Sequence, residues 1–215
     1  MTDARGVSWR DWAAALPDFA LAAVCLGTWI APAWLGPQRI GGLMLLMLVE
    51  FVVIHSAAFM GMVLWSDAPT RTRIVRVLGL GGFYSMFVAA FALGFHTWWP
   101  LAGFWILVLN RLLGALVGQA PSGAEREFVR RGWGAGAALY LLAVAVTTIA
   151  PVPRLGISAE VVRAADLSGS GLWIDEPYRV IAAAFLYFAL LGWSELYSHR
   201  TFRERNPRAV EPPAK

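Results

Sequence analysis

The stretch LVEFVVIHS at residues 48–56 places two groups with proton or metal chemistry, Glu50 and His55, inside an apolar run from Ile40 to Trp65. A carboxylate accepts protons or cations, and an imidazole is a common ligand of metals and haem iron. The two residues are five positions apart, which is about 140° around a helix of 3.6 residues per turn. They therefore lie on different helix faces and are two separate features.

Composition indicates which elements position these groups. Of 215 residues, 58% are hydrophobic and 15% are charged, and the mean hydropathy is +0.58. Ordinary soluble domains carry about 25% charged residues. Several stretches approach the roughly 20 apolar residues that cross a bilayer core of about 30 Å as a helix. The sequence therefore predicts an all-α integral membrane protein.

Apolar length and the punctuation by Pro, Gly and charge predict a bundle of six transmembrane helices in one domain over residues 17–198. The turn HTWWP with Pro100 separates the third span from the fourth, and the count falls to five if these two are one helix. Residues 1–16 are predicted as a cytoplasmic or interfacial leader and residues 199–215 as a basic cytoplasmic tail. The predicted spans are 17–36, 40–65, 77–95, 99–118, 133–152 and 178–198.

Basic residues predict the orientation, because short cytoplasmic loops carry an excess of Lys and Arg. The two sides of the predicted bundle hold thirteen and four of them. The richer side holds Arg5, Arg10, Arg71, Arg73, Arg76, Arg126, Arg130, Arg131, Arg200, Arg203, Arg205, Arg208 and Lys215, and the other Arg39, Arg154, Arg163 and Arg179. Both termini are therefore predicted to be cytoplasmic, in a bacterial inner membrane. Basic groups beside spans predict anionic lipid at that face as a partner, and they explain the net charge of +4 without nucleic acid.

Glu50 needs a polar partner, because a charge at mid-bilayer costs on the order of 3 kcal/mol on insertion scales. At 1.5 Å per residue from the outer ends of their helices, Glu50 lies about 15 Å deep and Arg111 about 18 Å deep. Asn110 is next to Arg111, and Tyr84 and Tyr187 fall near the same depth. The sequence thus predicts one polar layer of these five residues, which is either a functional site or an ion pair that fixes helix packing.

The remaining chemical groups give weaker signals. His55 is assigned to hydrogen-bonded helix packing, with a binding role as the alternative. A haem held by His55 and His199 would need its helices to shift by about 9 Å, so no cofactor and no metal is predicted. Glu195 is expected to be an interfacial charge near the end of the last span. The pairs Gly114/Gly118 and Gly132/Gly136 predict a close hairpin of the fourth and fifth spans.

Three functions remain open from the sequence. The favoured one is a small site or pathway for a proton, ion or polar solute, with Glu50 as acceptor and Arg111 as charge partner. The second is a non-catalytic structural or accessory subunit whose apolar faces meet a membrane-protein partner or another copy of the chain. The third is a haem-, quinone- or lipid-binding membrane enzyme that uses His55, His199 or Glu195. The sequence holds no HExxH motif, GxSxG motif or phosphate-binding glycine loop, so an enzyme is not favoured.

Overall fold

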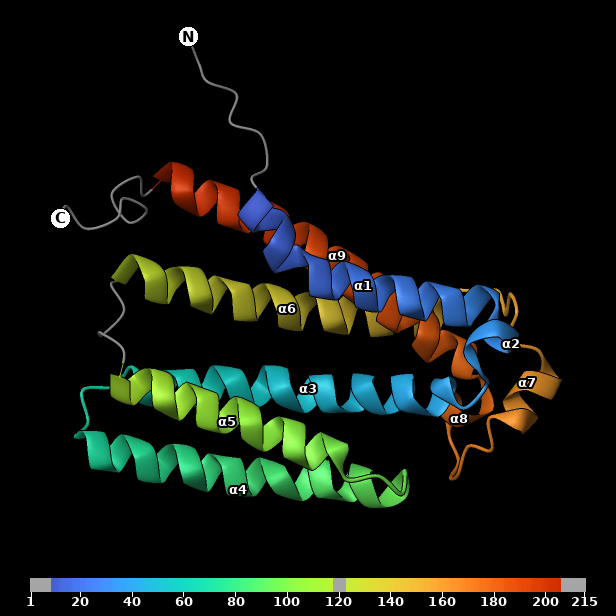
Figure 1. The fold of residues 1–215 in the computed structure, drawn as a ribbon, viewed down its shortest axis with the longest axis horizontal. Coiled ribbons are helices and arrows are strands. Elements are labelled where there is room, and N and C mark those ends of the chain that lie inside the picture. The colour runs from blue at the N-terminus through green and yellow to red at the C-terminus, as the bar shows by residue number, and fades with distance from the viewer. Residues whose placement is uncertain (1–8, 118–122, 206–215) are drawn as a thin grey trace, which may run out of the picture.

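The computed structural model describes residues 9–117 and 123–205, and every regular element in these ranges is a helix. The elements are α1 (Trp9–Ile30), α2 (Pro32–Leu35), α3 (Arg39–Leu64), α4 (Thr70–Gly94), α5 (Trp99–Val117), α6 (Gly123–Ile149), α7 (Ala159–Ala164), α8 (Leu172–Asp175) and α9 (Pro177–Arg205). Successive long helices run in opposite directions along the bundle (Figure 1). Helix α1 begins and α9 ends at the same end of the bundle, which we call the terminal end. The short helices α2, α7 and α8 lie at the opposite end, which we call the loop end.

Five of the described helices are long and apolar enough to cross a membrane: α1, α3, α4, α6 and α9. Helix α5 is also apolar, but its membrane-compatible stretch, Trp99–Gly114, is shorter. The described helices thus agree with the predicted helical membrane class and provide five candidate spans. A sixth span is not established. The predicted break at HTWWP is confirmed, because α4 ends at Gly94 and α5 begins at Trp99.

Several helices extend beyond the apolar stretches that predicted them. Helix α1 begins at Trp9, within the predicted leader, and α9 continues to Arg205, within the predicted tail. Helix α6 begins at Gly123 instead of residue 133. Its polar first turns are supported by Glu127, which pairs with Arg130 and Arg131 at helical i,i+3 and i,i+4 spacing. Hydropathy detects only the apolar part of such a helix.

The helices form two groups that share α3. One apolar cluster joins α3 to α1, α6 and α9, and a second joins α3 to α4 and α5. Half of the residues in the apolar windows of α3 and α9 are buried, against 22% in those of α1, α4 and α6. Large apolar side chains such as Met86, Ile106 and Ile149 point outward instead. Helices α3 and α9 are therefore the central pair, and the other faces suit contact with lipid.

The predicted hairpin of the fourth and fifth spans is wrong. Helix α5 packs on α4, whereas α6 packs on α9 and α3. A Cβ atom added at Gly114 or Gly132 would meet nothing within 4 Å, and Gly118 lies outside the described residues. Close approach occurs instead at Gly81 of α4, where an added Cβ would lie 3.3 Å from the ring of Trp105 on α5. Small-residue spacing alone did not identify which helices touch.

The loop end is tied to the helix ends by hydrogen bonds. Trp29 Nε1 donates to the carbonyl oxygen of Pro153 at 3.0 Å. Arg179 Nη1 donates to the carbonyl oxygens of Thr147 at 2.9 Å and Ala150 at 3.1 Å, which satisfies acceptors left open at the end of α6. The connection between α6 and α9 is thereby fixed against both α1 and α9.

Candidate functional site

Glu50 and Tyr187 form the centre of the site. Glu50 lies midway along α3, and Tyr187 lies on the facing surface of α9. Tyr187 Oη donates a hydrogen bond to Glu50 Oε1 at 2.7 Å. Only 1% of the Tyr187 surface is exposed, and Glu50 is half-buried. A hydroxyl donor thus meets the carboxylate at the interface of the two central helices.

A second tyrosine closes the site from α6. Tyr140 packs edge-on against Tyr187, with ring centroids 5.4 Å apart and an interplanar angle of 75°. Its hydroxyl donates to the carbonyl oxygen of Met47, one turn before Glu50 on α3, at 2.9 Å. Edge-to-face packing is a favoured aromatic geometry, and the hydrogen bond satisfies the buried hydroxyl. Three helices, α3, α6 and α9, therefore meet around Glu50.

Two further carboxyl groups face each other nearer the terminal end. Asp18 of α1 and Glu195 of α9 lie within hydrogen-bonding distance of one another. A hydrogen bond between two carboxyl groups needs one proton, because an ionised carboxylate is an acceptor only. Asp18 also interacts electrostatically with Glu50 and Tyr187. The three acidic groups thus form one electrostatically connected set.

Local sequence explains why α1 and α9 approach closely at Asp18. Gly192 of α9 faces this point, and an added Cβ there would lie 3.3 Å from both Asp18 Cβ and the ring of Phe19. Pro17 lies inside α1, directly before Asp18. Proline has no backbone N–H, so the helix loses one of its hydrogen bonds in this turn. The small residue on α9 therefore lets α1 approach closely enough for the two carboxyl groups to meet.

A cleft of about 820 Å³ leads from the terminal end to Tyr187. It lies between α3, α6 and α9, and Arg111 of α5 contributes to its wall. The α9 residues that line it follow the helical period and therefore share one face. These residues are Tyr187, Leu191, Ser194, Glu195 and Ser198. The cleft thus joins Glu195, near the end of α9, to the tyrosine that holds Glu50.

The structure brings together only part of the predicted polar layer. Glu50 and Tyr187 are hydrogen-bonded, and Arg111 shares the cleft with Tyr187. The Glu50–Arg111 ion pair does not occur among the described contacts, because Arg111 Nη1 is directed at Met60 Sδ, 3.9 Å away. Asn110 is exposed on the outer face of α5. Tyr84 is half-buried on α4, next to Phe83 and Phe87. Depth was a sound guide for Tyr187 but not for Asn110 or Tyr84, which lie on helices of the second group.

His55 lies apart from this cluster. Its Nδ1 is 2.9 Å from the carbonyl oxygen of Phe51, and its ring packs on the Phe51 ring with centroids 4.2 Å apart. It lines a different groove, between α3 and α6. The side chain of His199 lies outside the described ones, so the haem alternative that pairs it with His55 has no geometry here. Across the described part of the chain, no three His, Cys, Asp or Glu side chains converge as metal ligands.

Asp18, Tyr140 and Glu195 were absent from the predicted layer. For the two acids a signal existed, because both lie close to the terminal-end limits of their predicted spans, on helices that run antiparallel. Residues at matching distances from one end of adjacent antiparallel helices share a level. Tyr140 gave no comparable signal, since a single tyrosine in the apolar run GAALYLLAVAV is typical of a lipid-facing position too.

No protein-family model, curated protein or solved structure matches this chain. The class is therefore defined by the fold and the site alone: an all-helical protein with apolar helices of membrane-spanning length and an acidic and tyrosine cluster between its central helices.

Proposed function

We propose that this protein binds and moves protons within a membrane, with Glu50 as the central acceptor. The observation that carries the proposal is the 2.7 Å hydrogen bond to Glu50 from Tyr187, a tyrosine that also lines the cleft from the terminal end. Ionisable residues inside membrane segments are costly and commonly mark proton or ion pathways. A carboxylate that only fixed helix packing would not need an approach route.

A proton suits the site better than a larger ion. The available groups are carboxyls and phenols, which exchange protons along hydrogen bonds, in the order Asp18–Glu195, Tyr187, Glu50. Glu195 and Tyr187 are eight residues apart, about 12 Å along α9, and the cleft between them has room for bridging water. A hard cation would need several oxygen ligands around one point.

Arg111 and Arg131 are the basic groups of the cleft wall, and Glu127 and Glu195 are the acidic ones. Their charges offset one another, so the cleft wall has no net negative charge that would concentrate metal cations near Glu50. In this proposal Arg111 contributes positive charge to the wall of the cleft and does not pair with Glu50.

Access is from one end. Beyond Glu50, toward the loop end, α3 and α9 contribute the buried apolar side chains of Leu43, Met44, Met47 and Ile181. Such a cluster excludes water. We therefore propose that Glu50 exchanges protons with the terminal end, which the sequence predicts to be cytoplasmic, and that release to the other side requires α3 and α9 to move relative to each other.

The test is proton flux in liposomes that enclose a pH-sensitive dye, with an imposed pH gradient and a potassium diffusion potential. We expect the wild-type protein to dissipate the pH gradient. Glu50→Gln should lower the rate of proton flux on the order of 100-fold, since a positioned proton acceptor typically contributes that much. Tyr187→Phe should lower it less. Glu160→Gln, at an exposed acid of α7, is the matched control and should leave flux unchanged.

Infrared difference spectroscopy of the same samples detects Glu50 directly. A carboxylic C=O band that titrates in the wild type and is missing in Glu50→Gln is expected. Equal fluxes for a folded Glu50→Gln protein and the wild type, together with no missing band, would overturn the proposal and favour the structural-subunit alternative.

A further inference from the structure

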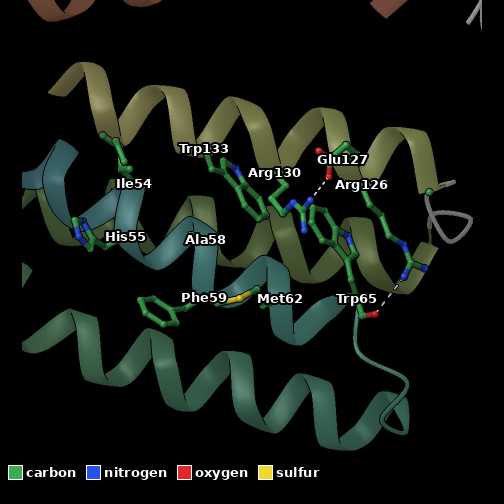
Figure 2. A pocket seen from close by; sticks show the side chains of 13 residues that line it. Ile54, His55, Ala58, Phe59, Met62, Trp65, Arg126, Glu127, Arg130 and Trp133 are labelled. Carbon is green, nitrogen blue, oxygen red and sulfur yellow. Dashed lines mark hydrogen bonds and ion pairs between the residues drawn. The ribbon is translucent and has the colours of Figure 1, made fainter. Parts of the chain in front are cut away.

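A second groove, of about 640 Å³, lies between α3 and α6 on the outer face of the bundle. Figure 2 shows two tryptophans and two arginines gathered at one end of it, with Phe59, Ile54 and His55 toward the other. Phe59 is 47% exposed and Met62 57% exposed, so the apolar part of the groove opens sideways. From these features we infer that the groove is a binding site for one anionic phospholipid.

The dimensions of the groove fit a lipid chain. It runs along α3 from Trp65 to His55, ten residues, which is about 15 Å at 1.5 Å per residue. A bilayer core is about 30 Å thick, so the acyl chains of one leaflet span about 15 Å, which matches the length of the groove. The α3 wall is apolar over this distance, with Ala58, Phe59 and Met62. A hydrocarbon chain is the ligand that such a wall selects.

The arginine end of the groove suits a phosphate headgroup. Arg126 and Arg130 line it from α6, one turn apart. Arg130 and Arg131 both pair with Glu127, and Arg126 Nη1 donates to the carbonyl oxygen of Trp65 at 3.3 Å. Among the residues that line the groove, Arg126 and Arg130 against Glu127 leave a formal charge of +1. Arginine binds phosphate oxygens through its planar fork of N–H donors.

Two stacked indoles mark the level of the headgroup. The rings of Trp65 and Trp133 lie parallel, 5.0 Å apart with an interplanar angle of 10°. Gly61 makes room for this pair, because a Cβ atom there would lie 1.8 Å from the Trp133 ring. Tryptophan concentrates at the membrane interface, where headgroups and acyl chains meet. The arginines gathered with the indoles at one end of the groove (Figure 2), and the apolar wall that continues from them, therefore match the two parts of a phospholipid.

The test is native mass spectrometry of the whole protein in detergent micelles doped with phosphatidylglycerol or phosphatidylcholine. One phosphatidylglycerol should be retained at much lower lipid concentration than phosphatidylcholine. Arg126→Gln with Arg130→Gln should weaken that retention about 30-fold, at about 1 kcal/mol per basic group. Arg71→Gln with Arg76→Gln removes equal charge from exposed positions at the same end of the bundle and should leave retention unchanged.

A second variant tests the apolar wall without touching charge. Ala58→Phe fills the groove beside Phe59 and should abolish the retained lipid while the helix content, measured by circular dichroism, stays intact. Any of three results would overturn the inference: equal weakening by the two arginine pairs, which indicates diffuse surface charge; retention unaffected by Ala58→Phe; or displacement of the lipid by inorganic phosphate. A bound second protein chain instead of lipid would also count against it.

Discussion

At the scale of single residues, the Tyr187 hydroxyl decides how Glu50 is held. A hydrogen bond to a charged group contributes about 1.5–3 kcal/mol net. We expect Tyr187→Phe to lower the free energy of unfolding by about 2 kcal/mol, and its effect to be non-additive with that of Glu50→Gln by about 1 kcal/mol or more. Unfolding in mixed micelles, followed by circular dichroism, measures both. Tyr84→Phe, at a half-buried tyrosine on α4, is the control, and strictly additive effects would show that the two side chains do not interact.

Glu176 gives a prediction about pH at the loop end, outside the membrane-spanning segments. A hydrogen bond from Arg179 is the main cause that lowers the pKa of this carboxyl below its ordinary value. Because the pKa in the folded state is the lower one, the stabilisation is fully present above the unfolded-state value of about 4.3 and is lost as pH falls through the folded-state value. The midpoint of thermal unfolding should therefore drop more steeply below about pH 4 for the wild type than for Glu176→Gln. Parallel pH profiles for the two proteins would exclude this linkage.

At the scale of elements, the contact between α3 and α6 depends on the absence of a side chain at Gly61. An added methyl group would overlap the Trp133 ring, 1.8 Å away, so the indole must move and its stacking on Trp65 is lost. We expect Gly61→Ala to destabilise the protein by about 1–3 kcal/mol through overpacking and to shift the tryptophan emission spectrum. Gly79→Ala, on α4 with open space around it, should be neutral or slightly stabilising. An unchanged emission spectrum in Gly61→Ala would mean that the two rings do not stack.

At the scale of the whole molecule, the sidedness of the helix ends tests the predicted orientation. In a Cys25→Ala background, single cysteines at Asp67, Glu125 and Ser170 report on the α3–α4 turn, the start of α6 and the α7–α8 turn, and all three positions are exposed. We expect an impermeant maleimide added to intact cells to label Ser170→Cys and to leave the other two unlabelled until the membrane is opened. Labelling of Asp67→Cys and Glu125→Cys from opposite sides would show that α5 does not cross the membrane with α4.

The sequence by itself determined the helical membrane class, most helix positions and the need of Glu50 for a polar partner. These follow from local quantities: the length of apolar runs, the position of Pro100, and the free energy of burying a charge. Helix ends were less predictable, because the polar extensions of α1, α6 and α9 carry no hydropathy signal.

Only the tertiary structure decided which groups surround Glu50. Depth along a helix is only one of the three spatial coordinates of a residue, and by depth alone Arg111 and Tyr187 are equally good neighbours for Glu50. Helix α5 packs on α4, which turns Arg111 toward Met60, whereas α9 packs between α1, α3 and α6 and presents Tyr187 to Glu50. Asp18 reaches Glu195 for the same reason, since Gly192 lets α1 lie close to α9. Neighbours and rotations arise from packing between distant segments, and no local property of one helix contains them.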